Sequence, residues 1–263
     1  MGDTLLNYDF VEISFNGTPV VHNISFSLRP GEILGLVGES GSGKSTLIKA
    51  AMGLLGDNGL VARGDITYKG KNLVDMSEHE LRSIRGAEIG MIFQDAGASL
   101  CPIRTIGSQI YESMKAHGKI TRADAKMRAM ELLSKLNFKK PERVWDSYPF
   151  ELSGGMNQRV GIAISMLMNP PVLLADEPTS ALDVAVQRQV VQEMLHVREL
   201  FGTAIIIVTH DIGVVSAMAD TVLVLKDGNK MEYGPAKEVL EHPQNIYTKE
   251  LLSAVPKLRR SQN

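Results

Sequence analysis

A glycine-rich stretch near the start of the chain has the composition and spacing of a phosphate-binding loop. Residues Gly38–Thr46 read G-E-S-G-S-G-K-S-T and match the pattern G-x-x-x-x-G-K-[ST]. Glycines let successive backbone N–H groups point at phosphate oxygens, and a helix start adds free N–H groups and a positive dipole end. Lys44 can reach the β- and γ-phosphates, and the Ser45 hydroxyl can ligate Mg²⁺. The candidate nucleotide contacts are Gly38, Ser40, Gly41, Ser42, Gly43, Lys44, Ser45 and Thr46.

Four apolar runs, each predicted to be a buried strand, lead into polar side chains. The run 33–37 precedes the loop with Lys44, and the run 89–93 ends at Gln94, whereas the runs 172–175 and 204–208 end at Asp176-Glu177 and at Thr209-His210. An Asp-Glu pair alone would be a solvated turn, and a lone histidine would be structural. Because open parallel sheets bind ligands at the carboxyl ends of their strands, the shared position argues for chemistry.

These residue types suit phosphoryl transfer to water, which needs neutralised charge, a metal and an oriented water. Asp176 suits Mg²⁺, directly or through water, because this ion prefers hard oxygen ligands. Glu177 lies one residue further on and cannot point the same way, so it suits the general base. His210 can donate a hydrogen bond to the γ-phosphate. The predicted catalytic residues are Glu177, His210, Lys44 and Gln94, and the predicted metal ligands are Ser45, Gln94 and Asp176.

A second helix start with glycines lies in Leu152–Gln158, which reads L-S-G-G-M-N-Q. Ser153 can cap a helix that runs to Met168, and Gly154 with Gly155 would leave its first turn open to a bound anion. An ordinary serine cap with incidental glycines explains the same residues equally well. The stretch alone therefore leaves both interpretations open.

Asp183 and Phe15 lie outside these motifs. Asp183 can cap the helix 184–200. Phe15 lies just before the hairpin turn Asn16-Gly17, and its spacing favours core packing over stacking on a base.

Composition limits the function classes. The chain has 263 residues, 44% of them hydrophobic, and a net charge of -2, so bulk charge gives no case for binding nucleic acid. A single cysteine excludes an internal disulfide framework. The apolar runs are shorter than the roughly 18 residues of a membrane-spanning helix, so we expect a membrane role only through a partner.

The order of strand and helix patterns predicts an α/β fold with a mostly parallel sheet. Hairpin signals at the start indicate an N-terminal antiparallel β subdomain, and helical periodicity replaces the strand runs after residue 95. The expected parts are a nucleotide-binding core with the β subdomain over 1–95 and 159–235, an inserted α-helical subdomain over 96–158, and a helical tail over 236–263.

The ordered set of motifs resembles the ATP-binding cassette (ABC) transporter ATPase family over nearly the whole chain. Leu152–Met156 matches that family's signature sequence and lies about twenty residues before Asp176-Glu177. The resemblance implies a P-loop NTPase core that binds and hydrolyses ATP with Mg²⁺. It also implies that Phe15 stacks on adenine, and that residues 95–105 receive a helix of a transmembrane permease.

Members of this family work as head-to-tail dimers, in which ATP lies between one phosphate loop and the opposite signature. The resemblance therefore implies that Ser153, Gly154 and Gly155 contact the partner's ATP and that Asp183 communicates across the dimer. Such a dimer would explain why one chain carries two anion-binding helix starts.

A narrower resemblance points to the dipeptide, oligopeptide and nickel importer subfamily. It rests on Tyr148–Glu151 and on the segment from His242-Pro243 to Pro256, whereas Ala96 and Leu100–Pro102 depart from the usual pattern. It implies a peripheral subunit on the cytoplasmic face of the cell membrane. The implied partners are permease subunits, a second ABC ATPase subunit and, indirectly, a solute-binding protein. The subfamily favours a heterodimer of two different ATPase subunits over a homodimer. Nucleic acid is not expected as a partner.

The sequence disfavours two other functions of a chain with a phosphate loop. A soluble cassette acting on ribosomes or DNA is disfavoured because such proteins usually carry two cassettes or long coiled-coil insertions. A nucleotide-dependent regulatory module without turnover is disfavoured by the complete catalytic set. The transported solute, whether peptide, nickel or metallophore, is not determined by the sequence.

Overall fold

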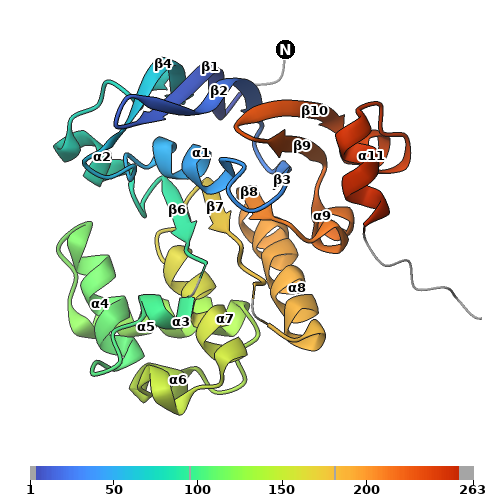
Figure 1. Ribbon diagram of the computed structural model, residues 1–263. Coiled ribbons are helices and arrows are strands. Elements are labelled where there is room, and N and C mark those ends of the chain that lie inside the picture. The colour runs from blue at the N-terminus through green and yellow to red at the C-terminus, as the bar shows by residue number, and fades with distance from the viewer. Residues whose placement is uncertain (1–3, 95, 181, 255–263) are drawn as a thin grey trace, which may run out of the picture.

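The computed structural model describes residues 4–94, 96–180 and 182–254, arranged as Figure 1 shows. The strands are β1 (Leu6–Phe15), β2 (Thr18–Leu28), β3 (Ile33–Val37), β4 (Gly59–Tyr68), β5 (Lys71–Asn72), β6 (Ile89–Ile92), β7 (Val172–Asp176), β8 (Ala204–Thr209), β9 (Thr221–Lys226) and β10 (Asn229–Pro235). The helices are α1 (Lys44–Ala51), α2 (Glu78–Ile84), α3 (Ala96–Ser99), α4 (Ile106–Ala116), α5 (Arg122–Lys135), α6 (Pro141–Asp146), the 3-10 turn η1 (Pro149–Glu151), α7 (Gly154–Ser165), α8 (Val184–Phe201), α9 (Ile212–Met218), α10 (Ala236–Glu241) and α11 (Ile246–Ser253).

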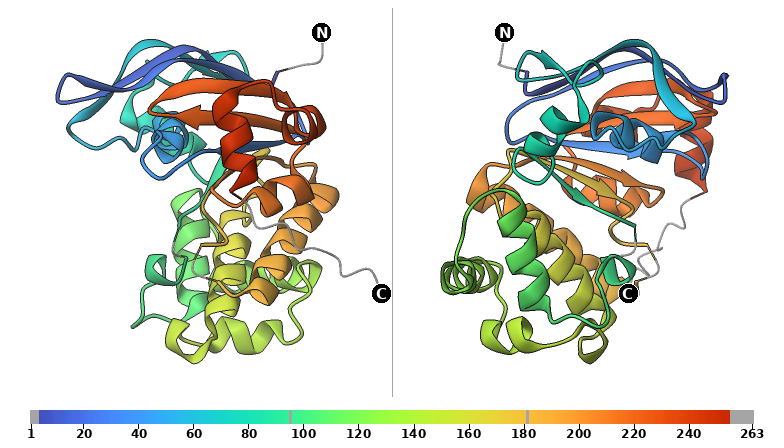
Figure 2. Two further views of the ribbon diagram at one scale, coloured as in Figure 1. Left: turned by 45° about the vertical axis from the view of Figure 1, so that its right-hand side comes forward. Right: turned by 90° about the vertical axis from the view of Figure 1, so that its left-hand side faces the viewer.

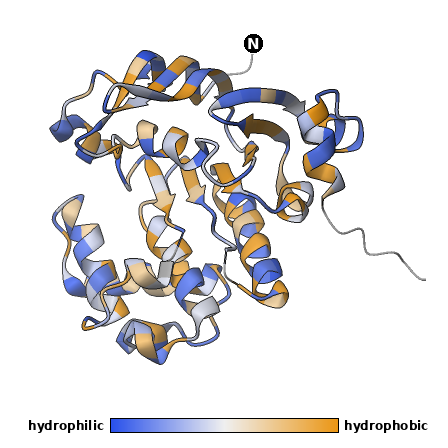
Figure 3. Ribbon diagram, viewed as in Figure 1, coloured by the Kyte–Doolittle hydropathy of each residue, from blue (hydrophilic) through white to orange (hydrophobic). Residues whose placement is uncertain are grey.

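The larger sheet has the strand order β10-β9-β3-β8-β7-β6. The strands from β9 to β6 are parallel, and β10 pairs antiparallel with β9 at one edge. Strands β3, β7 and β8 are buried along their whole length, which is why they read as continuous apolar runs. Figure 3 shows these strands coloured mostly as hydrophobic. Because β3, β6, β7 and β8 run in the same direction, the polar residues that follow them all lie at the carboxyl-terminal end of these strands.

The smaller sheet, with the order β2-β1-β4-β5, is antiparallel. Its first hairpin turns at Asn16 and Gly17, whose φ values are 48° and 76°, as a two-residue hairpin turn requires. Helix α1 packs between the two sheets in one apolar cluster that includes Leu47 and Ile48. The Tyr8 hydroxyl of β1 donates to the Leu47 carbonyl oxygen at 3.0 Å. The helix that begins at the phosphate loop is therefore fixed from both sides.

A second apolar cluster joins the opposite face of the larger sheet to helices α4 to α8, and Figure 2 shows α4, α5 and α6 farther from the sheets, in a helical lobe. One face of α5 and its C-cap is buried in this cluster, with Ala125, Ala129, Leu132, Leu133 and Leu136 all buried. A third cluster joins α9, α10 and α11 to the edge of the larger sheet. Within the described residues, no helix is both long enough and apolar enough to cross a bilayer.

The predicted fold class is confirmed: a mostly parallel sheet, an antiparallel β subdomain and an inserted helical subdomain. The predicted helix end at Met168 is wrong, because α7 ends at Ser165 and Asn169 turns with φ 50° before two prolines. The predicted boundary between 158 and 159 falls inside α7, which packs in the apolar cluster shared by the sheet and the helical lobe. The C-terminal tail is helical as far as the described residues extend.

Candidate functional site

The phosphate loop connects β3 to α1 in a conformation that only glycine permits at several positions. Gly38 has φ 152°, and a Cβ there would lie 2.1 Å from the Leu225 carbonyl oxygen. Gly41 and Gly43 have φ values of 82° and 94°. Gly43 is the N-cap of α1, and because it has no side chain it offers no acceptor to the first N–H groups. These groups stay available for an anion.

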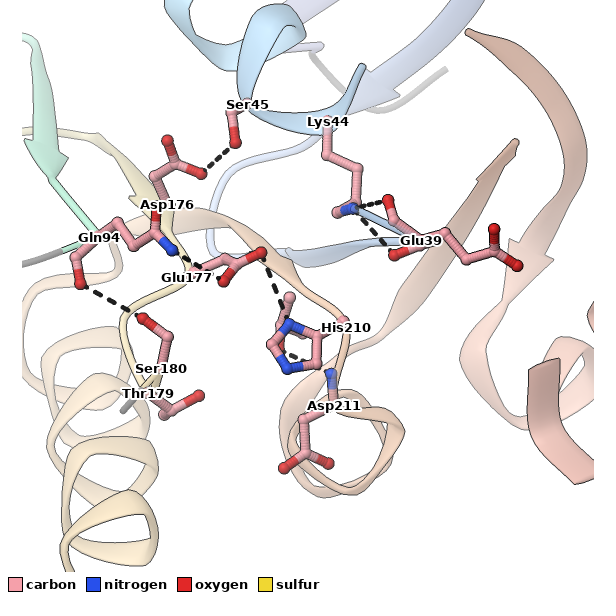
Figure 4. Close-up of polar contacts among 12 residues, drawn as sticks. Glu39, Lys44, Ser45, Gln94, Asp176, Glu177, Thr179, Ser180, His210 and Asp211 are labelled. Atoms are coloured by element: carbon pink, nitrogen blue, oxygen red, sulfur yellow. Dashed lines mark hydrogen bonds and ion pairs between the residues drawn. The ribbon is translucent and has the colours of Figure 1, made fainter. Parts of the chain in front are cut away.

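Lys44 stretches back along the loop. Its ammonium donates to the carbonyl oxygens of Gly38 at 2.9 Å and Glu39 at 2.6 Å, and to the Ser42 hydroxyl at 3.3 Å, as Figure 4 shows in part. Burial lowers the pKa of Lys44, although nearby carboxylates, Glu177 foremost, oppose this effect. The charge is therefore held at the centre of the loop by weak neutral acceptors, which phosphate oxygens can replace.

Ser45 and Asp176 meet where a magnesium ion is expected. The Ser45 hydroxyl donates to the Asp176 carboxylate at 2.5 Å, and Asp176 is only 4% exposed. Gln94 follows β6 next to β7, so its amide lies at the same edge of the sheet. The donor set is a hydroxyl, a carboxylate and an amide oxygen. Such hard oxygen ligands fit Mg²⁺.

Glu177 points away from Asp176, as predicted. Its backbone is left-handed with φ 45°, a conformation that costs a non-glycine residue about 1 to 3 kcal/mol. Its N–H donates to the Val208 carbonyl oxygen at 2.9 Å. Its carboxylate accepts from Gln94 Nε2 at 3.2 Å and lies 3.5 Å from His210 Nδ1. The strained turn thus directs the carboxylate toward the other polar strand ends (Figure 4).

Apart from Asp176, the side chains named above line one cavity of about 490 Å³. Its lining contains Ser40, Gly41, Ser42, Gly43, Lys44, Ser45, Thr46, Gln94, Glu177 and His210. Residues from the loop and from the ends of three strands therefore face the same space. A polyphosphate in this space would meet N–H donors and an ammonium on one side and a carboxylate and an imidazole on the other.

The second helix start lies elsewhere. Ser153 caps α7 by accepting the Met156 N–H at 3.3 Å, and no residue of Ser153–Gly155 is among those lining the phosphate cavity. A Cβ at Gly155 would come within 2.8 Å of Val186, so packing alone accounts for that glycine, whereas Gly154 faces open space. Within the described residues, the start of α1 lines the phosphate cavity and the start of α7 does not.

Two other candidates also lie outside this cavity. Phe15 is half-buried and packs against the apolar cluster of the smaller sheet. Asp183 caps α8, and its Oδ1 accepts the N–H groups of Ala185 and Val186, both at 3.0 Å. In this structure Phe15 therefore packs against the core, and Asp183 acts as a helix cap.

Sequence reasoning missed one charged residue near the site. Lys49 Nζ lies 3.8 Å from the second carboxylate oxygen of Asp176. Lys49 follows Ser45 by four residues, so both lie on one face of α1 and reach the same carboxylate. The i, i+4 spacing of Ser45 and Lys49 in the sequence could have indicated that Lys49 lies near the metal site.

Comparisons with known proteins give consistent results. The family described as "ABC transporter" matches residues 21–180. Oligopeptide transport ATP-binding protein OppD of Escherichia coli is 43% identical over 261 residues, covering 97% of this chain and 77% of that protein. Metal-staphylopine import system ATP-binding protein CntD of Staphylococcus aureus is 38% identical over 257 residues, covering 97% of this chain and 94% of that protein.

Solved structures agree. The dimeric ATP-binding cassette MJ0796, in a post-hydrolysis state bound to ADP and Pi, has a TM-score of 0.75 and 28% identity, covering 88% of this chain and 99% of that one. The chain cbiO1 from Clostridium perfringens, part of an ABC transporter complex, has a TM-score of 0.78 and 29% identity, covering 91% and 92%. Because these matches extend along most of the sequence, this chain belongs to the ABC transporter family, as an ATP-binding and ATP-hydrolysing subunit of an importer.

Proposed function

We propose that ATP binds with its phosphates on Gly38–Thr46 and is hydrolysed there to drive solute uptake through a membrane permease. The observation that carries this proposal is the single cavity shared by the loop, Gln94, Glu177 and His210. Mg²⁺, bound by Ser45, Gln94 and Asp176, would neutralise phosphate charge.

The chain's own residues have distinct parts in the reaction. The Lys44 ammonium exchanges loop carbonyls for phosphate oxygens. Glu177 takes the proton of the attacking water as general base, and the Gln94 amide holds that carboxylate in place. His210 donates a hydrogen bond to the γ-phosphate. Phe15, at the end of β1, stacks on the adenine.

The complete site needs a second cassette. The first turn of α7, with Ser153, Gly154 and Gly155, closes over the ATP bound to the other subunit, and Asp183 lies at the same interface. The separation of the two helix starts within one chain supports this arrangement, and the solved relative MJ0796 is described as dimeric. The partner is a related ATPase or a second copy of this chain.

An apolar groove next to the site is the proposed docking surface for the permease. It is a cavity of about 380 Å³ formed by the end of β6 and by α3, α4 and α7, and it includes Phe93, Leu100 and Ile164. Its rim is held by Gln109, whose amide bonds to both the N–H and the carbonyl oxygen of Cys101. A short helix of a transmembrane subunit fits such a groove. The chain would then lie on the cytoplasmic face of the cell membrane.

The solute is a peptide or a metal chelate, by analogy with OppD and CntD, or nickel, which the resemblance to the importer subfamily alone implies. Selectivity resides in the permease and in a solute-binding protein, which this chain meets only indirectly. To test this function, the tagged chain is purified from native membranes, its co-purifying subunits are identified, and the complex is reconstituted for ATP-dependent uptake. Uptake of peptides or of a nickel chelate, abolished by Lys44→Ala, is expected. Co-purification with ribosomes or DNA at moderate salt, without a permease, would contradict it.

A further inference from the structure

The C-terminal helix α11 contacts the phosphate loop. The hydroxyl of Tyr247 accepts the backbone N–H of Glu39 at 3.3 Å, and the carbonyl oxygen of the same Glu39 accepts the Lys44 ammonium at 2.6 Å. Tyr247 is 6% exposed, so water competes little for its hydroxyl. Both backbone groups of Glu39 are therefore bonded, one to the tail and the other to the lysine of the loop.

The start of α11 is fixed to β10, so its tyrosine has a defined position. The Asn245 side chain accepts the Tyr247 N–H at 2.9 Å and donates to the Met231 carbonyl oxygen at 3.0 Å. The Glu232 carboxylate accepts the backbone N–H groups of Gln244 at 2.8 Å and Asn245 at 3.2 Å. Figure 1 shows α11 beside the edge of the larger sheet formed by β10. Three hydrogen bonds thus connect β10 to the turn before the tyrosine, and a fourth joins that turn to Tyr247 itself.

The ring of Tyr247 is held as well as its hydroxyl. Lys226 Nζ, at the end of β9, lies 4.6 Å from the ring centroid, a distance at which a cation attracts the ring face. Burial raises the pKa of Tyr247, so the phenol is neutral at physiological pH. The turn after Lys226 also supports the loop, because the Gly228 N–H donates to the Ser42 carbonyl oxygen at 3.2 Å. The β9–β10 hairpin and α11 therefore brace the loop together.

We infer that Tyr247 is a positioning residue for ATP binding, which holds the Glu39 peptide so that the loop and Lys44 are preorganised for the phosphates. This inference rests on the proposed placement of the nucleotide on the loop. Tyr247 itself touches no phosphate. Because the loop holds phosphates in the ground state and in the transition state alike, loosening it weakens binding and leaves the turnover of bound ATP nearly unchanged.

The test compares Tyr247→Phe with Tyr233→Phe in the purified full chain. Tyr247→Phe removes one hydroxyl and keeps the ring over which Lys226 lies. Tyr233 is a matched control because its hydroxyl donates to the Ser27 carbonyl oxygen at 3.4 Å on β2, outside the loop. Calorimetric titration with Mg²⁺ and a non-hydrolysable ATP analogue should show a Kd about five-fold weaker for Tyr247→Phe, the effect of one lost hydrogen bond. The Kd of Tyr233→Phe should equal that of the wild type.

A third variant separates the two ideas under test. If Lys44→Ala abolishes binding while Tyr247→Phe leaves the Kd unchanged, the positioning role is overturned and the nucleotide placement stands. Binding retained by Lys44→Ala overturns the placement itself. In the complete transporter, Tyr247→Phe should raise KM about five-fold with kcat within two-fold of wild type. A fall in the kcat of Tyr247→Phe with an unchanged KM would contradict the inference. A lower Tm with an unchanged Kd would also contradict it, because a residue with a purely structural role gives that result.

Discussion

Replacing Glu177 by glutamine removes the proposed general base and changes little else in the site. Glutamine has nearly the same size, and its amide oxygen can still accept the hydrogen bond from Gln94 Nε2, which is 3.2 Å from the carboxylate. The left-handed backbone at this position strains glutamine as it strains glutamate. The variant should therefore fold like the wild type, and the Lys44 and Ser45 contacts with ATP should remain.

The size of the effect follows from the role. A positioned general base contributes about 10²- to 10⁴-fold to a rate, which corresponds to about 3 to 5.5 kcal/mol of transition-state stabilisation. We expect Glu177→Gln to lower kcat by about 100-fold or more while the Kd for ATP stays within about three-fold of wild type.

The assay pairs steady-state phosphate release with calorimetric titration of MgATP. Glu199→Gln, an exposed change of the same type on α8, serves as the matched control and should hydrolyse ATP at the wild-type rate. Hydrolysis by Glu177→Gln at close to the wild-type rate would refute the base assignment. Loss of ATP binding in that variant would instead mean that the carboxylate holds the nucleotide.

Two further changes test the loop and the fold. Gly38→Ala places a Cβ 2.1 Å from a backbone carbonyl oxygen of β9, so this variant should lose ATP binding and have a lower Tm. The Cβ of Gly41→Ala meets open space at φ 82°, so this variant should lose only about 1 to 2 kcal/mol of stability. Equal losses of Tm in the two variants would be inconsistent with the loop geometry. Burial, together with a hydrogen bond to Glu88, raises the pKa of Tyr68 to about 12, so the unfolded chain loses this proton first and the free energy of unfolding should fall as the pH rises from about 10 to about 12. Tyr68→Phe should flatten that alkaline decline in urea unfolding experiments, and an unchanged slope would count against the shift.

The sequence predicted most of the arrangement around the phosphate cavity, because parallel strands share one edge. Gln94, Glu177 and His210 each follow a different apolar run, and the rule that such runs pair in parallel was enough to expect them together. The roles of these residues, and of Ser153, Phe15 and Asp183, remain predictions.

Other features depend on tertiary contacts that no local pattern encodes. The contact between Tyr247 and Glu39 joins residues 208 positions apart, and the strand order that places β9 next to β3 could not be inferred from the hairpin alone. The left-handed turn at Glu177 is stabilised by the Val208 carbonyl oxygen of the neighbouring strand, and glutamate carries no propensity for it. The helix α7 ends at Ser165 because the backbone then tightens into turns, in which the Leu167 N–H donates to the Ile164 carbonyl oxygen at 3.2 Å and the Asn169 N–H donates to the Met166 carbonyl oxygen at 2.9 Å. The apolar residues up to Met168 give no local sign of this change.

The most direct test is a cryo-EM structure of the Glu177→Gln variant with MgATP, in its transporter complex. We predict triphosphate density within hydrogen-bond distance of Lys44 Nζ and the N–H groups of the phosphate loop, covered by the first turn of α7, or its counterpart, from the other ATPase subunit. An empty phosphate loop, or ATP contacted by Ser153 of the same chain, would contradict the account.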